Sequence, residues 1–125
     1  MKFSKMLLGA VIVASLVGFT SPTFAGSMTW IMTDSCPNRE EIRYRFFTDS
    51  EDWQWPGRGQ YFVTKKYSEA YHSTITCRSG DKICYGAWQP GSQNYWGVGE
   101  FGNGACEGCC ARCDGGVHSR RLTCN

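Results

Sequence analysis

The sequence feature that most constrains the fold is a cysteine cluster in which two CxxC units are fused back to back, over residues 106–113. This CxxCCxxC cluster contains four of the chain's eight cysteines: Cys106, Cys109, Cys110 and Cys113. The other four are spread through the sequence: Cys36, Cys77, Cys84 and Cys124. An even number of cysteines in a short exported chain is typical of a disulfide framework. How these sulfur atoms are used therefore decides both the fold and the chemistry open to the protein.

The N-terminal segment indicates export. Lys2 and Lys5 precede an uncharged apolar run over residues 6–19, which is too short to span a bilayer. Small residues, Thr23 and Ala25, then stand at the third-last and last positions before Gly26. This order predicts a signal peptide over residues 1–25, with cleavage after Ala25, and a short membrane anchor is the alternative. We therefore expect a secreted or periplasmic protein with no membrane attachment after cleavage.

The predicted mature domain, residues 26–125, has no net charge. Loss of the leader removes two lysines and leaves eleven basic and eleven acidic side chains. Nucleic-acid binding depends on a surplus of basic side chains that neutralise phosphates. The charge balance therefore argues against nucleic acid as a partner.

Aromatic residues must build the core of this domain. Residues 26–125 contain only eight valine, isoleucine and leucine residues, against five tryptophans, six tyrosines and four phenylalanines. A buried aromatic ring removes on the order of 150–250 Å² from water, so rings can replace the missing aliphatic side chains. For a chain this short we also expect disulfides to supply much of the stability, at about 2–4 kcal/mol each.

Alternation and turn signals predict an all-β domain. Ile42, Tyr44 and Phe46 alternate with arginines, which is the period of a half-buried strand. Further segments of strand character cover residues 61–64, 71–77, 83–88 and 95–98. Glycine and proline turns separate them, and no window has a sustained helical period. The expected fold is a small, disulfide-rich antiparallel sandwich or barrel.

Structural disulfides are the favoured use of the cysteines. Because adjacent cysteines bridge each other only under strain, Cys109 and Cys110 should each pair elsewhere. A turn over residues 79–82 predicts a hairpin, which would place Cys77 opposite Cys84. A bridge between Cys36 and Cys124 would tie the ends of the domain together. The remaining connectivity stays open, because eight cysteines allow 105 pairings.

Metal binding and thiol exchange are the less favoured uses of the cysteine cluster. Zinc-ribbon CxxC units usually stand about 15–20 residues apart, whereas these abut, so we expect no metal and no cofactor. A redox CxxC usually precedes a helix whose N-terminus lowers the thiol pKa. Here glycines flank the cluster and no helix is predicted after it.

The sequence contains no assembled catalytic constellation. His72 and His118 are its two histidines, and neither has a nucleophile at a recognisable spacing. The carboxylates at positions 49, 51 and 52 lie in one polar loop and do not form a separated acid/base pair. Glu100, beside an aromatic run, is the carboxylate to consider for a glycosidase.

Aromatic side chains near predicted turns are the candidate ligand-binding residues: Trp53, Trp55, Trp88, Tyr95 and Trp96. Rigid rings beside polar turn residues are used in sugar and protein recognition. The alternative is that these rings are core, which is the favoured interpretation for Trp88 and Trp96 and stays open for Trp53 and Trp55. We expect a non-enzymatic binding domain for a glycan or protein. The alternatives are a small glycosidase-like hydrolase that uses Glu100 and a toxin or inhibitor scaffold.

Three short sequence words carry a family resemblance: ICYGAW at residues 83–88, WGVG at residues 96–99, and the CxxCCxxC cluster. With these words the chain resembles a group of small exported cysteine-rich proteins over residues 53–113. The resemblance implies a compact disulfide-bonded β domain and carries no activity over to this chain.

Overall fold

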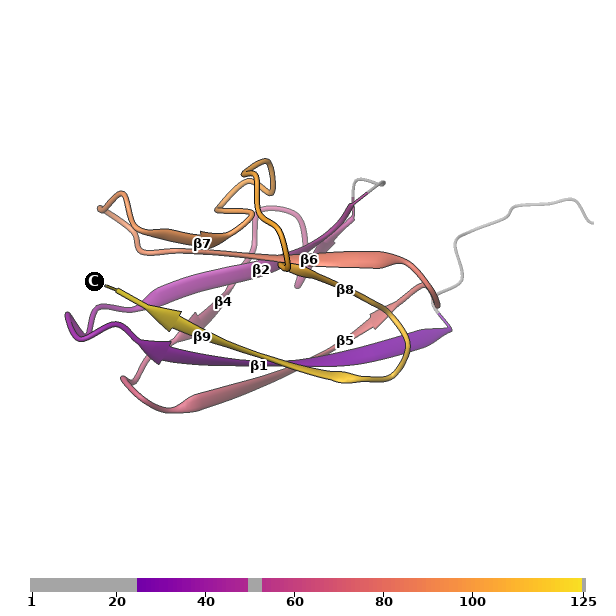
Figure 1. The fold of residues 1–125 in the computed structure, drawn as a ribbon, viewed down its shortest axis with the longest axis horizontal. Coiled ribbons are helices and arrows are strands. Elements are labelled where there is room, and N and C mark those ends of the chain that lie inside the picture. Colours follow the sequence, from indigo (N-terminus) through magenta and orange to yellow (C-terminus); the bar gives the residue numbers. More distant parts are fainter. Residues whose placement is uncertain (1–24, 50–52, 125) are drawn as a thin grey trace, which may run out of the picture.

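The computed structural model describes residues 25–49 and 53–124, which form a two-layer β sandwich (Figure 1). Its strands are β1 (Gly26–Ser35), β2 (Ile42–Thr48), β3 (Gln54–Trp55), β4 (Phe62–Thr64), β5 (Ala70–Cys77), β6 (Lys82–Trp88), β7 (Tyr95–Gly97), β8 (Cys110–Arg112) and β9 (Val117–Thr123). Within the described ranges, no helix is long and apolar enough to cross a bilayer. The signal peptide predicted over residues 1–25 lies outside the described residues, apart from Ala25.

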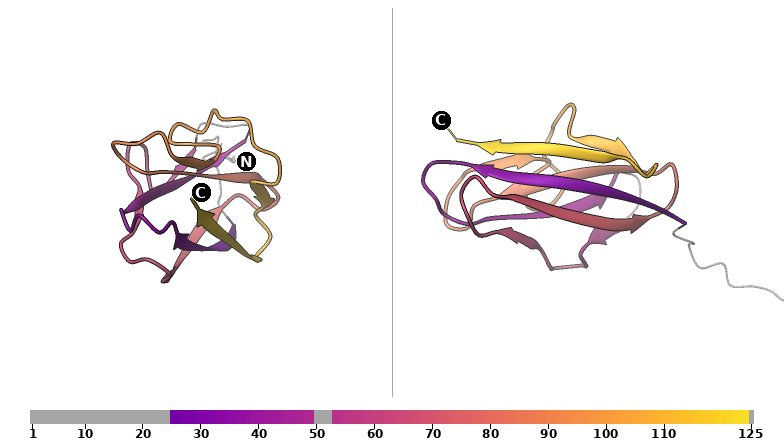
Figure 2. Two further views of the ribbon diagram at one scale, coloured as in Figure 1. Left: turned by 60° about the vertical axis from the view of Figure 1, so that its left-hand side comes forward. Right: turned by 90° about the horizontal axis from the view of Figure 1, so that it is seen from below.

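The nine strands found in the described residues form two sheets. The first, sheet A, has the order β5-β1-β9, and these three strands lie side by side in the right-hand view of Figure 2. The second, sheet B, has the order β3-β2-β6-β7, with β4 also pairing with β2 and β8 with β6. The predicted all-β sandwich is therefore confirmed, and neither sheet closes into a barrel. One pair departs from the antiparallel pattern, because β1 and β9 run parallel.

Strand β1 places alternate residues in the core. Met28, Trp30 and Met32 are buried, and the residues between them point outward. β1 is the middle strand of sheet A, whereas β9 is an edge strand in which Leu122 is the one buried residue. Neither strand was expected from the sequence, so the whole of sheet A except β5 is a finding of the structure.

Aromatic rings fill the space between the sheets, as the composition predicts. Trp30 of sheet A is fully buried, and its ring stacks on Phe46 of sheet B at a centroid distance of 5.2 Å. The ring of Tyr85 packs against the same tryptophan at 5.9 Å. Tyr44 stacks on Phe62 at 5.2 Å and continues the cluster along sheet B. The core therefore depends on ring contacts that join the two layers.

Four disulfides use all eight cysteines: Cys36–Cys124, Cys77–Cys113, Cys84–Cys110 and Cys106–Cys109. The expected bridge between Cys36 and Cys124 is confirmed. The expected separate pairing of Cys109 and Cys110 is confirmed as well.

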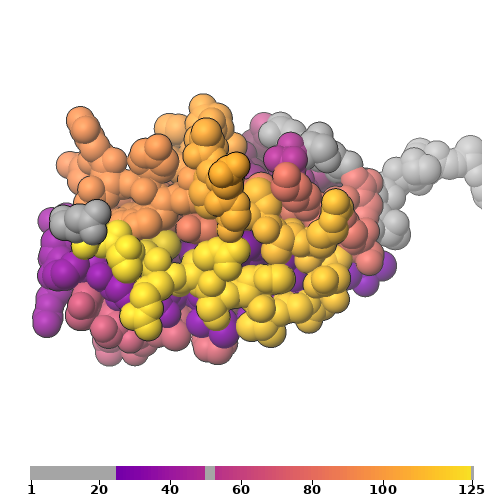
Figure 3. All heavy atoms as spheres, viewed as in Figure 1, coloured from indigo at the N-terminus to yellow at the C-terminus, as the bar shows by residue number. Residues whose placement is uncertain are grey.

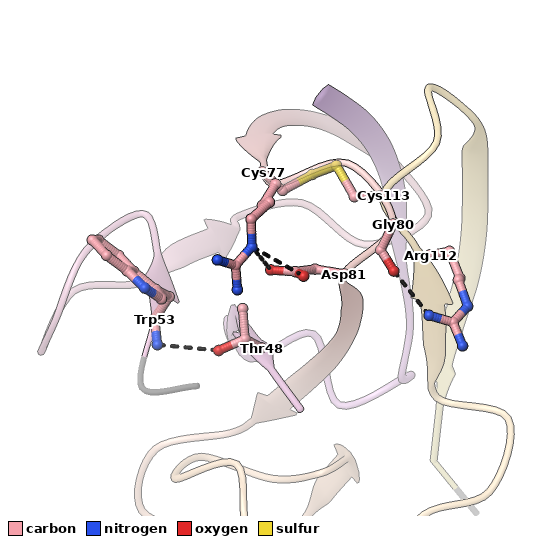
Figure 4. A network of polar contacts seen from close by, with 8 residues as sticks. Thr48, Trp53, Cys77, Gly80, Asp81, Arg112 and Cys113 are labelled. Carbon is pink, nitrogen blue, oxygen red and sulfur yellow. Dashed lines mark hydrogen bonds and ion pairs between the residues drawn. A yellow bond between two sulfur atoms is a disulfide. The ribbon is translucent and has the colours of Figure 1, made fainter. Parts of the chain in front are cut away.

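The predicted bridge between Cys77 and Cys84 is wrong. β5 and β6 are consecutive but belong to different sheets, so the turn between them crosses from sheet A to sheet B and forms no hairpin. Figure 4 shows this end of the sandwich, where Cys77 is bonded to Cys113 beside the turn. The Gly80 N–H donates to the carbonyl of Cys113 at 2.8 Å, and the Cys113 N–H donates to the carbonyl of Asp81 at 2.9 Å. The end of the cysteine cluster thus lies against this turn, which brings Cys113 within bonding distance of Cys77.

Asp34 is a buried carboxylate at the end of β1. It is 1% exposed, and its Oδ1 accepts a hydrogen bond of 2.8 Å from the Cys36 N–H. Burial raises the pKa of Asp34, and the hydrogen bond from Cys36 opposes that rise in part. Because the pKa in the folded state lies above that in the unfolded state, the folded state favours the protonated carboxyl. The stability that comes from this proton is lost as the pH rises through the folded-state pKa.

Asp34→Asn should therefore stabilise the domain at neutral pH. Asparagine keeps an oxygen that can accept from Cys36 and carries no charge to desolvate. We expect a higher melting temperature than that of the natural protein at pH 7, with the difference shrinking as the pH falls through the raised folded-state pKa and disappearing below about 4, where an ordinary aspartate is also protonated. Thermal unfolding followed by circular dichroism over this pH range makes the comparison. A variant that is less stable at pH 7 would show that the charge itself holds the end of β1.

The four disulfides should contribute unequally to stability. In the loop-closure description a bridge restricts the unfolded chain more when it closes a longer loop. Cys36 and Cys124 are 88 residues apart, whereas Cys106 and Cys109 are three apart. Replacement of the first pair by alanine should lower the unfolding free energy by about 4–5 kcal/mol, and replacement of the second pair by about 2 kcal/mol. Denaturant unfolding of both double variants tests this order, and a greater loss at the short loop would contradict it.

Candidate functional site

The five candidate rings divide between separate hollows on the surface. Trp88 and Tyr95 line one hollow, whereas Trp53 and Trp55 line another that shares no residue with it. Trp96 lines a third, smaller hollow, which also includes Tyr95. The structure therefore brings Trp88, Tyr95 and Trp96 into one region at the hairpin of β6 and β7, and it places the other two tryptophans elsewhere.

The hollow at this hairpin, called here the polar hollow, has a volume of about 570 Å³. It is formed mainly by the turn over residues 89–95 and by the loop over residues 98–104. In the space-filling view the orange segments that contain these residues rise as separate projections from the upper face (Figure 3). The predicted turn between β6 and β7 is therefore confirmed as a hairpin, and it forms one wall of the hollow.

Two strongly exposed rings stand on the walls of the polar hollow. Tyr95 is 60% exposed and Phe101 is 70% exposed, and Phe101 is the most exposed large apolar side chain among the described residues. Phe101 was not among the sequence candidates. Its position in a glycine-rich loop, next to Glu100, is the signal that could have identified it, because such a loop offers a ring little to pack against.

Trp88 also lines the hollow and is 7% exposed, so it belongs to the protein interior, as the sequence favoured. The guanidinium of Arg45 lies 4.6 Å from its ring centroid, and Tyr61 meets the ring edge-on at 5.9 Å. Such a cation over an indole face is a favourable electrostatic contact. Arg45 and Tyr61 therefore hold the Trp88 ring in one position in the lining of the hollow.

Arg45 fixes the loop that carries Phe101. Its Nε donates to the carbonyl of Gln60 and its Nη1 to the carbonyl of Glu100, both at 3.0 Å. Arg45 is 8% exposed, and burial lowers its pKa, whereas the neighbouring Glu100 and Tyr61 raise it. The two carbonyls and the face of the Trp88 ring replace the water that the guanidinium loses on burial. The buried Arg45 can therefore anchor the loop through the carbonyl of Glu100.

Gln89 fixes the opposite wall. It is 1% exposed, and its Oε1 accepts from Nδ2 of Asn38 and from Nδ2 of Asn94, each at 2.9 Å. Its Nε2 donates to Oδ1 of Asn38 at 2.9 Å and to the carbonyl of Glu40 at 3.2 Å. A buried amide with both ends satisfied is a rigid anchor. These hydrogen bonds thus hold the turn in one geometry.

The rim of the polar hollow is rich in uncharged hydrogen-bonding groups. Apart from the buried, satisfied amide of Gln89 and the ring hydroxyl of Tyr95, the amide and hydroxyl side chains in its lining are those of Ser92, Gln93, Asn94 and Asn103. Glu100 is the one carboxylate among the described lining residues, and Arg43 is the one cation. Nε of Arg43 is paired with Oε2 of Glu41 at 2.7 Å. The hollow therefore presents neutral donors and acceptors next to exposed rings.

The second hollow, of about 660 Å³, lies next to Trp53 and Trp55. Trp53 is 40% exposed, and its backbone N–H donates to Oγ1 of Thr48 at 3.1 Å (Figure 4). Trp55 is half-buried, packs against the core, and donates from Nε1 to the carbonyl of Thr76 on sheet A at 2.8 Å. Trp96 makes the equivalent link from β7, to the carbonyl of Thr123 at 2.8 Å. Trp55 and Trp96 therefore join the two sheets.

The remaining ionisable candidates do not assemble into a catalytic site within the described residues. His72 is exposed on β5, and the ring of His118 packs on Trp30 at 5.3 Å. Most of the acidic loop over residues 49–52 lies outside the described residues. In the described part of the chain, no group of three or more histidine, cysteine or acidic side chains is placed to hold a metal ion.

Comparison with known proteins gives no relative from which a function could be transferred. No protein-family model, curated protein or solved structure matches the chain.

Substitution of the two tryptophans in the second hollow should show which of them is a core residue and which is a surface residue. We expect Trp55→Ala to lower the unfolding free energy by about 3 kcal/mol or more, because it removes a packed ring and a link between the sheets. Trp53→Ala, at the more exposed position, should cost about 1 kcal/mol or less. Denaturant unfolding of each variant provides the measurement. Equal losses would mean that Trp53 is also part of the core.

Proposed function

We propose that this protein is an exported, non-enzymatic binding domain whose polar hollow takes an uncharged glycan. The observation that carries the proposal is the pair of exposed rings, Tyr95 and Phe101, on the two walls of a hollow rimmed by neutral amides. Four disulfides indicate an oxidising environment and support secretion or a periplasmic location.

The chemistry of the hollow suits a sugar. A pyranose ring has apolar C–H faces that stack on aromatic rings, and its hydroxyl groups need a hydrogen-bonding partner on the protein. Tyr95 and Phe101 offer the ring faces, and exposed amide side chains such as Gln93 and Asn103 offer both donors and acceptors. Because the two walls are fixed by Gln89 and Arg45, little conformational freedom would be lost on binding.

A protein ligand is the weaker alternative for this hollow. The centres of protein interfaces are depleted in charge, well packed and largely apolar. The lining here consists mainly of amide, hydroxyl and backbone groups, with Glu100 and Arg43 among them. This composition favours a ligand that carries many hydroxyl groups.

The glycosidase alternative has one supporting observation, the position of Glu100 in the lining. Glycosidases generally use two carboxyl groups on either side of the scissile bond. The described lining provides one such group, so binding without hydrolysis is the better-supported function.

Binding should be measured on an array of immobilised glycans and by sedimentation with insoluble cellulose, chitin and peptidoglycan. Tyr95→Ala and Phe101→Ala should each weaken retention at least about tenfold, which corresponds to ~1.4 kcal/mol, and should leave the melting temperature nearly unchanged. Tyr67→Ala is the matched control, because Tyr67 is also an exposed ring but does not line the polar hollow. Retention of no glycan by the natural protein, or equal losses in all three variants, would overturn the proposal.

The same incubations distinguish binding from hydrolysis. Release of reducing ends by the natural protein, abolished in Glu100→Gln, would move the assignment to a hydrolase. Bound glycan that is recovered intact supports a binding domain.

A further inference from the structure

The disulfide between Cys106 and Cys109 differs from the other three in the loop that it closes. Its cysteines are three residues apart, whereas the other pairs are 26, 36 and 88 apart. A bridge that closes so short a loop restricts the unfolded chain least, so it adds least to the stability of the fold. Opening this bond therefore costs the domain less stability than opening any of the other three.

The surroundings of the Cys106–Cys109 disulfide also differ from those of the other three. Cys106 is half-buried in a loop between β7 and β8, and Glu107 and Gly108 are exposed. The other three bridges join cysteines that lie in strands or directly follow one. Two of them also include a half-buried cysteine, but each of those bridges clamps strands together. The Cys106–Cys109 bond spans no pair of strands, so its opening disrupts no sheet.

The two cysteines of this bond are unequally accessible. Cys109 is 4% exposed, and its carbonyl accepts a hydrogen bond of 3.1 Å from the Tyr85 N–H of β6. Cys106 is the more accessible of the two: it lies outside the strands and packs only partly against the cluster of Phe47, Cys84 and Val98. An incoming thiolate should therefore reach the sulfur of Cys106, while Cys109 keeps its place against β6.

A fixed cation lies beside this loop. Nη2 of Arg120 donates to the carbonyl of Gly108 at 3.1 Å, one residue before Cys109. The guanidinium is held over the rings of Trp30 and Tyr85, at 5.3 and 5.7 Å from their centroids. Such a cation stabilises the negative charge that appears on a sulfur atom when a disulfide opens. Arg120 could therefore take the role that a helix N-terminus has in other CxxC sites.

We propose that Cys106–Cys109 is a thiol–disulfide exchange site that accepts two electrons from an external dithiol, while the other three disulfides stay closed. A thiolate of the dithiol attacks Sγ of Cys106, the bond to Cys109 breaks, and Cys109 leaves as a thiolate. The second thiol of the dithiol then attacks its partner sulfur in the mixed disulfide and releases Cys106. The protein gains two thiols, which take up the dithiol's two protons, and the dithiol is oxidised to a disulfide.

The test uses the full-length natural protein and dithiothreitol as the dithiol. Samples equilibrated at increasing dithiothreitol concentration are quenched with an alkylating reagent, and the labelled cysteines are located by peptide mass mapping. Cys106 and Cys109 should become labelled at a concentration at least about tenfold below that needed for the other six cysteines. Near-ultraviolet circular dichroism should stay native over that interval. Simultaneous labelling of all eight cysteines, or earlier labelling of another pair, would overturn the proposal.

A monothiol tests the direction of attack. With glutathione in place of dithiothreitol, the mixed disulfide should form on Cys106, and glutathione found on Cys109 would contradict the assignment. Arg120→Gln tests the role of the cation, and Arg121→Gln is a matched control on the adjacent, exposed position of β9. Arg120→Gln should raise the dithiothreitol concentration needed for the first two thiols, and Arg121→Gln should leave it unchanged. Equal effects of the two substitutions would remove Arg120 from the account.

Discussion

The packing of Trp30 between the sheets is the interaction on which the rest of the structure depends. This ring from β1 contacts Phe46 of β2 and Tyr85 of β6, so one side chain joins the centre of sheet A to the two central strands of sheet B. The chain has few aliphatic residues with which to replace it. Disulfides also fix the ends of the strands that these rings hold together, and rings and disulfides both compensate for a core with few aliphatic side chains.

Buried polar side chains anchor the loops of the candidate site to this framework. Gln89 holds the turn after β6, and Arg45 on β2 holds the loop after β7 by its main-chain carbonyl. Gln89 and Arg45 are both buried and cannot contact a ligand directly. They act on the site by fixing the segments that carry the exposed rings of Tyr95 and Phe101. In the same hollow, Trp88 is therefore buried, whereas Tyr95 and Phe101 are exposed to solvent.

The sequence predicted the fold class better than it predicted the pairing of strands. Alternation identified β2, and the turn after Trp88 identified a true hairpin. The segment before Cys84 also has the sequence pattern of a hairpin, but its turn connects strands of two different sheets. The sequence of a turn does not determine which sheet the next strand joins. β9 was missed for a related reason. Only Leu122 on it is buried, and its parallel partner β1 is distant in sequence.

The candidate site could be predicted only in part, because composition cannot separate an exposed ring from a buried one. Tyr95 and Trp96 are adjacent, yet the first is exposed and the second is tied to Thr123 across the sandwich. Phe101 escaped notice because a lone ring in a glycine-rich loop has no periodic signal. Its place beside a hollow depends on Arg45, which is more than fifty residues away in sequence.

The most direct test of the glycan-binding account is a titration of the isotope-labelled protein with cellotetraose and N-acetylchitotetraose, followed by amide and side-chain NMR spectra. Glycan binding in the polar hollow should give saturable shifts for Gln93, Asn94 and Asn103 and for the rings of Tyr95 and Phe101, with Trp53 unaffected. Shifts centred on Trp53, or none with either oligosaccharide at millimolar concentration, would contradict it.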